Sequence, residues 1–501
     1  MISRRKKLSK YLYGASVQGI QGFIFETNKL KEIVGASDLV EQFCSKDFLK
    51  KFANEHGVTI KEENIVRNAG GNIRVIFENK NDLVSMVKNF SKYVMQKAYG
   101  ITISQAVVEF NEKEYLNGVE ELERALVKAR NQATFPLDAR FALMKQTPRT
   151  GKAAYKFKNE EYFDKGSWQK VDNIDDAQLE MLLNKLELKS IAHKFPLEMD
   201  DIANSNNKVA VIHADGNKMG LMLQQMNKDL KGKSDKEIQN IFKTFSKAIT
   251  KSTNDAVKEA FEKTFSKDDK TIKFRPIIIG GDDVTVICDA NKAVEFTKNY
   301  LEAFEKNTEN NFEQNNLAKY AKKLTACAGI AFCNKKFPFH YAYSLAEHLC
   351  SYSKEKSNRE ASCLTYHNIQ SSYVEDYKTY IKQELTTNED ITLTCAPYYV
   401  NQNPKIETLL ELYSRFNDED IPLGKYREWI RELYKSKEFA DIFLDRIDSV
   451  LKSKIGKKYS EIDDKLKELH SDLKLSNLIV EKKTPMQDIL QLKAVMRGSR
   501  V

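Results

Sequence analysis

The chain repeats one order of apolar and polar segments twice. In each half, an apolar strand precedes helical segments whose apolar residues recur at steps of three and four. A strand, a Gly-Gly turn and a second strand come next, and a helix and a further strand follow. The repeated order predicts an internal duplication.

The same patterns predict where each element lies, and a serine at position 37 is expected to cap the helix that follows it. The first half is expected to contain strands at 11–16 and 101–110, a hairpin at 65–77, and helices at 26–34, 38–55, 82–97 and 114–131. The second half is expected to contain strands at 208–213, 324–332, 362–367 and 391–400, a hairpin at 274–288, and helices at 217–228, 235–265, 290–308 and 338–353. Further helices are expected at 406–416, 426–435, 439–451 and 462–473.

This order of elements favours an α+β fold. Strands joined by crossover helices on one face are typical of a ferredoxin-like β-α-β-β-α-β core, the palm shape of many nucleotide polymerases and cyclases. An irregular, proline-interrupted stretch with one helical run at 176–191 separates the halves, and charged helices end the chain. The expected domains are a first, degenerate palm at 1–132, a connecting domain at 133–207, a second palm at 208–403 and a C-terminal helical domain at 404–501.

Composition indicates a cytoplasmic protein with a mild preference for anionic partners. The 501 residues carry a net charge of +9, which weakly favours nucleotides or nucleic acid. The seven cysteines include no CxxC pair, so reduced, buried thiols in a cytosolic protein are the default expectation. No apolar run approaches the ~20 residues of a membrane span, so no membrane partner is expected.

The second hairpin carries two acids at its tip. Gly280 and Gly281 can adopt the positive φ angles of a tight turn, and Asp282 and Asp283 follow them between two apolar runs. Adjacent carboxylates bind divalent cations, and glycines let a phosphate approach the backbone. An ordinary acidic turn is the alternative interpretation.

Asp215 is the third candidate acid. It follows the strand at 208–213, which in a ferredoxin-like sheet lies beside the hairpin, so Asp215 should meet the two hairpin acids. Gly216, Asn217 and Lys218 then lead into a helix, whose N-terminal amides favour phosphate. A plain helix N-cap at Asp215 is the alternative.

Three converging acids suit phosphoryl transfer from a triphosphate. The reaction needs positioning and charge neutralisation, which two divalent ions about 3.5–4 Å apart supply. We therefore expect Mg²⁺ or Mn²⁺ on these acids. Lys354, at the end of a helix, could face the triphosphate, although a solvated lysine is the alternative. The first hairpin, with Gly70 and Gly71, carries no acid, so the first palm is expected to keep the shape of a palm without its acids.

Several motifs resemble the large subunit of type III CRISPR effector complexes. Those of the second half resemble that family's second palm, and those of the first half its first palm. The motifs are residues 215–218, 280–283, 325–329 and 337–339 in the second half, and 18–24 and 35–39 in the first.

The resemblance implies a cyclase-type polymerase. It would join ATP through 3′–5′ bonds into cyclic oligoadenylates, the second messengers of an antiviral defence, with guide RNA and other effector subunits as partners. Asp215, Asp282 and Asp283 would hold the metals and act in catalysis. The remaining implied contacts to ATP are Gly216, Asn217, Lys218, Gly280, Gly281 and Lys354 for the donor, and Ser37, Gly70 and Gly71 for the acceptor.

Two features of that family are not expected in this chain. It contains no His-Asp dipeptide, so no nuclease of that type is expected. Residues 146–154 resemble the surroundings of a zinc site between the palms, but 51–287 contain no cysteine, so no zinc is expected. These departures suit a stand-alone or oligomeric cyclase. The alternatives are a catalytically vestigial subunit of an RNA-guided complex, a cyclic-dinucleotide synthase and a template-directed polymerase.

Overall fold

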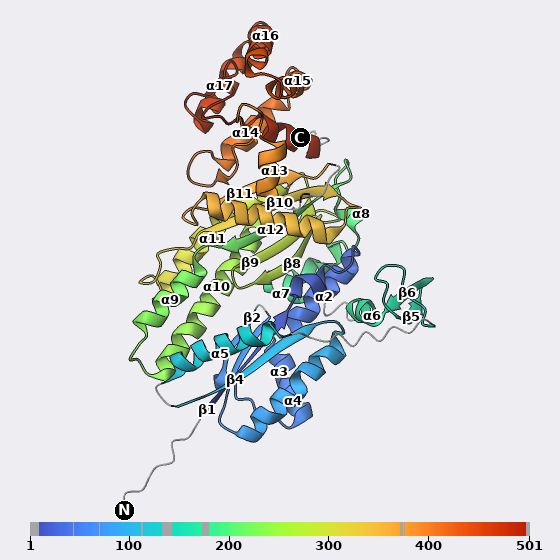
Figure 1. Cartoon of the computed structure of the whole chain (residues 1–501), viewed down its shortest axis with the longest axis vertical. Helices are drawn as coiled ribbons and strands as arrows, with labels where there is room; N and C mark the ends of the chain where they lie inside the picture. The colour runs from blue at the N-terminus through green and yellow to red at the C-terminus, as the bar shows by residue number, and fades with distance from the viewer. Residues whose placement is uncertain are drawn as a thin grey trace, which may run out of the picture.

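Two helix-covered sheets and a helical C-terminal part follow one another along the long axis of the protein (Figure 1). In this computed structural model, the first sheet lies at one end, and helices α14–α17 lie at the other. No helix within the described ranges is long and apolar enough to cross a membrane. The structure describes residues 10–43, 45–69, 71–111, 114–132, 143–172, 180–370, 374 and 376–496.

The first sheet has four antiparallel strands in the order β2-β3-β1-β4. β1 pairs with β3 on one side and with β4 on the other, which is the strand order of a ferredoxin-like core. The predicted first palm fold is therefore confirmed. Its strands are Lys10–Gln18 (β1), Ile65–Ala69 (β2), Asn72–Phe77 (β3) and Thr102–Phe110 (β4). Its helices are Ile20–Ile24 (α1), Leu30–Phe43 (α2), Lys46–His56 (α3), Glu62–Asn64 (η1), Lys80–Lys97 (α4) and Tyr115–Arg130 (α5).

The predicted helix cap at Ser37 is wrong. Ser37 lies inside α2, because the buried stretch from Leu30 continues the helix through it. Its hydroxyl donates to the carbonyl of Ile277, and such a bond allows a serine to sit within a helix. The next helix, α3, is capped instead by Ser45, which accepts a hydrogen bond from the amide of Phe48.

The segment between the sheets is more regular than its sequence indicates. It contains a hairpin and two short helices, α6 and α8, that were not expected. The predicted helix at 176–191 is only partly right: residues 173–179 lie outside the described ones, and a left-handed φ of 58° at Glu187 separates two short helices. The elements are Ala154–Lys158 (β5), Glu161–Asp164 (β6), Lys165–Asp172 (α6), Glu180–Lys185 (α7), Lys189–Lys194 (η2) and Met199–Ile202 (α8).

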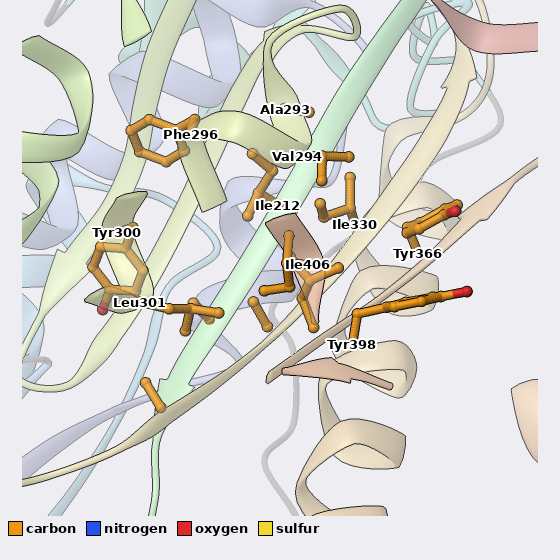
Figure 2. Close-up of a cluster of buried hydrophobic side chains, with 14 of the residues drawn as sticks. Ile212, Ala293, Val294, Phe296, Tyr300, Leu301, Ile330, Tyr366, Tyr398 and Ile406 are labelled. Atoms are coloured by element: carbon orange, nitrogen blue, oxygen red, sulfur yellow. The ribbon is translucent and has the colours of Figure 1, made fainter. Parts of the chain in front are cut away.

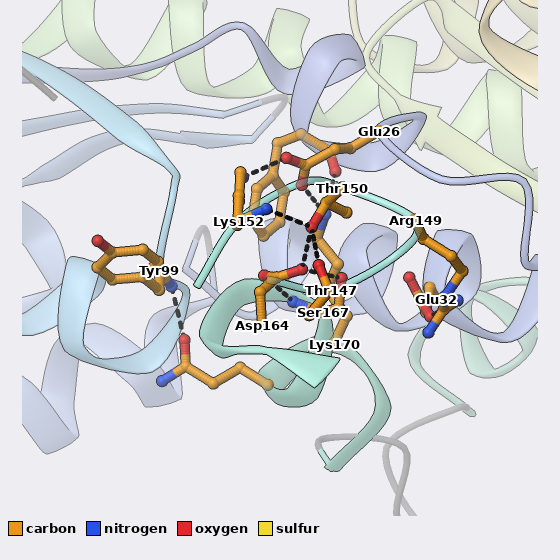
Figure 3. Close-up of polar contacts among 12 residues, drawn as sticks. Glu26, Glu32, Tyr99, Thr147, Arg149, Thr150, Lys152, Asp164, Ser167 and Lys170 are labelled. Carbon is orange, nitrogen blue, oxygen red and sulfur yellow. Dashed lines mark hydrogen bonds and ion pairs between the residues drawn. The ribbon is translucent and has the colours of Figure 1, made fainter. Parts of the chain in front are cut away.

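Buried charges fasten this segment to the first sheet (Figure 3). Lys170, which is 1% exposed, donates to the carbonyl of Phe23 at 2.7 Å and to Glu26 at 2.8 Å. Lys152 also pairs with Glu26. Breaking a buried pair leaves an uncompensated charge, so this network holds the segment in one position against α1 and α2.

The second sheet has six strands in the order β12-β11-β10-β7-β9-β8. Its central strand β7 pairs antiparallel with both β9 and β10, as in the first sheet. The second palm fold is confirmed. Its strands are Lys208–Gly216 (β7), Phe274–Gly280 (β8), Asp283–Asp289 (β9), Ala326–Asn334 (β10), Cys363–Asn368 (β11) and Tyr398–Tyr399 (β12). Its helices are Met219–Asp229 (α9), Asp235–Thr264 (α10), Ala293–Gln314 (α11), Phe339–Lys356 (α12) and Tyr377–Glu384 (α13).

The expected strand at 391–400 is mostly wrong. Only Tyr398–Tyr399 joins the sheet, next to β11. Pro397 precedes these two residues and has no N–H group to donate to a neighbouring strand, which is consistent with the short pairing. The apolar residues of this stretch are buried in the cluster that the second sheet shares with the C-terminal helices.

The core of the second sheet runs without a break into the C-terminal helices (Figure 2). Ile212 of β7 and Ile330 of β10 lie in the same cluster as Ile406 of α14. The four predicted helices are confirmed, and a fifth, α18, was not expected. They are Ile406–Phe416 (α14), Leu423–Leu433 (α15), Lys437–Ile455 (α16), Lys457–Leu469 (α17) and Met486–Val495 (α18).

The two palms also share a core. The ring of Phe25, which follows α1, stacks on Tyr343 of α12 with ring centroids 4.3 Å apart. The rings of Phe25 and Phe339 also lie close together, with centroids 5.2 Å apart. One apolar cluster contains residues of both sheets, so the first palm is packed directly against the second.

A glycine lets α12 lie close to the second sheet. A Cβ atom on Gly329 of β10 would stand 2.0 Å from the carbonyl oxygen of Ala346 and 2.6 Å from the amide of Cys350. Both are backbone atoms of α12, which cannot move aside without shifting the helix. This close approach sets the height of α12, which carries Lys354, above the sheet.

We expect Gly329→Ala to lower the free energy of unfolding by about 3 kcal/mol, because the added methyl group overpacks a backbone contact. Urea unfolding followed by circular dichroism measures the change. Gly424→Ala is the matched control, because nothing lies within 4 Å of its Cβ position in α15, and alanine favours helix. An unfolding midpoint for Gly329→Ala equal to that of the wild type would contradict the packing described here.

Candidate functional site

The tip of the β8–β9 hairpin lies beside the end of β7. Antiparallel pairing of β7 with β9 brings Asp215 level with Asp283. A Cβ atom on Gly216 would stand 2.8 Å from Oδ2 of Asp282, so Asp282 also lies against the end of β7. The structure thus brings the three candidate acids together.

Burial and mutual repulsion act on the two hairpin acids. Burial raises the pKa of Asp282 to about 7, and the nearby charges of Asp215 and Asp283 add to the rise. Burial of its Oδ1 atom, followed by the charge of Asp215, raises the pKa of Asp283 to about 7 as well, while 45% of that side chain is exposed. Oδ1 of Asp283 is buried and has no hydrogen-bond partner among the described residues. This cluster is therefore short of positive charge.

Lys354 supplies part of that charge. Its ammonium pairs with Oδ2 of Asp215 and donates to the carbonyl of Gly216 at 2.9 Å. Its charge also partly opposes the rise in the pKa of Asp283. Because the side chain is only 13% exposed and paired, the alternative of a solvated lysine is wrong.

Sequence reasoning missed His213. Its Nε2 lies 3.7 Å from Oδ1 of Asp283, and its Nδ1 lies 3.2 Å from the hydroxyl of Thr285. Burial lowers the pKa of His213. The signal available in the sequence was its spacing: residues two apart on a strand face the same side, and His213 precedes Asp215 by two.

The acids suit divalent cations by their chemistry. Carboxylate oxygens are the ligands that Mg²⁺ and Mn²⁺ prefer, and a cation would relieve both the repulsion and the unpaired oxygen of Asp283. Across the described ranges, no three Asp, Glu, His or Cys side chains form a ready-made metal site. Asp215 is engaged by Lys354 here, so cation binding requires that ion pair to rearrange.

One pocket is lined by both palms. It has a volume of about 420 Å³ and lies between the first palm and the β8–β9 hairpin. The Cβ position of Gly71, with φ +73°, is only 2.5 Å from Ile20, so a larger residue would fill this region. Gly70 lies outside the described residues. The candidate residues that line the pocket are Ser37, Gly71, Gly280, Gly281, Asp282 and Asp283.

A second pocket, of about 540 Å³, opens beside the turn that follows β7. Asn217 is buried and donates to the hydroxyl of Thr325 at 2.9 Å, which holds the turn against β10. Lys218 has a left-handed φ of 60°, precedes α9 and pairs with Glu360. Arg359 also lines this pocket, which therefore combines apolar walls with cationic side chains and with Glu360.

Comparison with known proteins agrees with this geometry. The family profile of the Cas10/Cmr2 second palm domain matches residues 208–363. These residues are therefore similar in sequence to a Cas10/Cmr2 second palm domain. The match contains all three acids and Lys354, and it confirms the resemblance that the motifs indicate. No curated protein matches the sequence.

Solved structures with the same fold include Csm1 proteins. The crystal structure of a Csm1–Csm4 cassette in complex with cA3 aligns at a TM-score of 0.55 and 12% identity, over 98% of this chain and 70% of that one. A Csm1–Csm4 cassette with AMPPNP aligns at 0.54 and 13% identity, with the same coverage. Csm1 from T. onnurineus aligns at 0.52 and 12% identity, over 99% and 71%. At these identities the likeness concerns the fold, and it extends through both palms and the C-terminal helices.

We expect the clustered acids to make metal-free protein less stable as pH rises. Their raised pKa values mean that the folded state holds protons which the unfolded state releases near pH 4, so the cost grows from pH 4 to pH 7 and then levels off. Asp282→Asn combined with Asp283→Asn should therefore raise the unfolding temperature by a few degrees at pH 8 and hardly at all at pH 4.

Thermal unfolding in the presence of a chelator, at several pH values, measures this difference. Asp268→Asn with Asp269→Asn is the control, since these adjacent aspartates are exposed in the loop before β8. A hairpin variant that is less stable than the wild type at pH 8 would contradict the repulsion described above.

Proposed function

We propose that this chain is a metal-dependent nucleotidyltransferase that converts ATP into cyclic oligoadenylates in a CRISPR type III-like antiviral defence. The observation that carries the proposal is the convergence of Asp215, Asp282 and Asp283 at one end of the second sheet, where the two hairpin acids line the pocket shared by the palms. The fold shared with Csm1 structures that were solved with cA3 and with AMPPNP supports it. A cytoplasmic location and a zinc-free connecting segment stay predictions.

The donor ATP is assigned to the pocket beside the turn after β7. Lys218 and Arg359 line this pocket and would meet the negative charge of a triphosphate. Lys354 lies at the end of β7, and on release from Asp215 it could pair with a phosphate instead. Gly216 leaves room for the close approach of a phosphate to the backbone.

The acceptor ATP is assigned to the pocket shared by the palms. Gly71 and the paired glycines of the second hairpin line it, and none of them carries a side chain that would fill it. Because this pocket is bordered by Asp282 and Asp283, an acceptor there would present its 3′-hydroxyl near the acids. The first palm would thus contribute shape, and the second palm charge.

The three carboxylates would hold Mg²⁺ or Mn²⁺. When bound, such ions lower the pKa of an attacking hydroxyl and neutralise the developing charge of a transferring phosphoryl group. The protein contributes orientation: β7 and β9 keep the acids in register, Asn217 holds the turn, and His213 lies behind Asp283. An Nε2–H group on His213 would favour the ionised form of that carboxylate.

Other subunits are proposed as partners, because the similar Csm1 chains were solved together with Csm4. Guide RNA would reach the chain through such an assembly. A protein that works alone or as an oligomer would show activity without these partners, so the purified chain and its complex should be assayed side by side.

We expect Asp282→Asn combined with Asp283→Asn to reduce pyrophosphate release from ATP by at least about 10³-fold, because the loss of several kcal/mol of charge stabilisation falls on the transition state. Release is measured with Mg²⁺ or Mn²⁺, and products are identified by mass spectrometry. The exposed pair Asp268→Asn with Asp269→Asn should keep wild-type activity. Pyrophosphate release by the hairpin variant at the wild-type rate would refute the assignment.

A further inference from the structure

β8 is the edge strand of the six-stranded sheet, and it carries the acidic tip. It pairs with β9 on one side, and no strand among the described residues pairs with its other side. An edge strand presents unpaired backbone groups, and the carbonyls of alternate residues point to the same edge. The position of Asp282 and Asp283 therefore depends on what holds this edge.

Three side chains donate to alternate carbonyls along β8 and into its turn. Ser37 donates to Ile277, Lys185 to Ile279 at 3.3 Å, and Thr253 to Gly281 at 2.7 Å. The three donors will be called the edge clamp. They come from α2 of the first palm, from α7 of the connecting segment and from α10 of the second palm.

Two of the three donors are buried, and Lys185 is 25% exposed. Thr253 is fully buried and Ser37 is 4% exposed. Lys185 pairs in addition with Glu41 of α2, at 2.6 Å, which ties it to the first palm. Hydrogen bonds of buried donors are costly to lose, because the partner carbonyl is then left without a replacement.

The tip has little else to hold it. Gly280 and Gly281 offer no side chains for packing, and the Cβ position of Gly281, whose φ is +66°, meets no atom within 4 Å. The two acids beside them repel each other and Asp215. A tip that is glycine-rich and negatively charged would move away from β7 unless its backbone were fastened from outside.

We infer that Ser37, Lys185 and Thr253 are positioning residues that hold the hairpin acids in register with Asp215. The inference rests on the proposed function where it concerns turnover, and on the structure alone where it concerns the hairpin. It also gives Ser37 a different role from the contact to an acceptor ATP that its motif implies, since its hydroxyl is already engaged by Ile277.

Thr253 gives the sharpest test, because valine has the same shape and lacks only the hydroxyl. Thr253→Val should lower kcat for pyrophosphate release at least ten-fold while KM for ATP changes less than three-fold, and Thr253→Ser should restore most of the rate. Thr297→Val is the matched control: this threonine is also fully buried, but its hydroxyl donates within its own helix, to Ala293 at 2.7 Å.

Hydrogen exchange supplies a readout that does not need activity. Amides of residues 281–284 should exchange about five-fold faster in Thr253→Val than in wild type, as expected for the loss of one hydrogen bond, and at the wild-type rate in Thr297→Val. Ser37→Ala and Lys185→Met should increase exchange along 277–280.

The two readouts separate the possible failures. Faster exchange in Thr253→Val, together with a wild-type protein that shows no activity, would support the clamp and refute the proposed function. Unchanged exchange at the tip in Thr253→Val would overturn the clamp, whatever the activity. A rise in KM without a fall in kcat, or no rescue by serine, would overturn the positioning role.

Discussion

Antiparallel pairing of β7 with β9 forces three carboxylates together at one end of the second sheet. The strands are buried and apolar along most of their length, so the hydrophobic core determines their register and places the acids at the same end of the sheet. The free energy of the core therefore maintains a charge cluster that would not form by itself. Most other features of the site compensate for the repulsion within this cluster.

Lys354 places a positive charge next to the clustered acids. It reaches Asp215 because α12 lies unusually close to β10, where only glycine fits at position 329. The edge clamp acts on the opposite side, where β8 would otherwise be free. The ion pair from Lys354 and the hydrogen bonds to the backbone of β8 together hold the acids near β7.

The two palms share a fold but differ in their hairpins. Both have the same strand order, but only the second hairpin carries acids. The first palm packs against the second through Phe25 and Tyr343 and closes one side of the shared pocket. A duplicated fold can thus keep one half for chemistry and use the other as the wall of a binding site.

The sequence predicted the parts of the fold that depend on local pattern. Both Gly-Gly hairpins, the long helices and the convergence of Asp215 with the hairpin acids followed from periodicity and from one topology. Long-range contacts were not predictable in this way. The burial of Lys354 on α12 depends on the close approach of that helix to Gly329 of β10, and the hydrogen bond of Ser37 depends on Ile277, far away in the sequence. The stretch at 391–400 is as apolar as a strand but packs as irregular backbone in the cluster that the second sheet shares with the C-terminal helices.

A structure with AMPPNP and Mn²⁺ tests the central claim most directly, since anomalous scattering locates manganese without assumptions about the ligands. The account predicts manganese between Asp215 and the two hairpin acids, one analogue molecule on each palm, and Lys354 released from Asp215. Manganese bound elsewhere, or a nucleotide that avoids both pockets while the three carboxylates keep their present contacts, would contradict it.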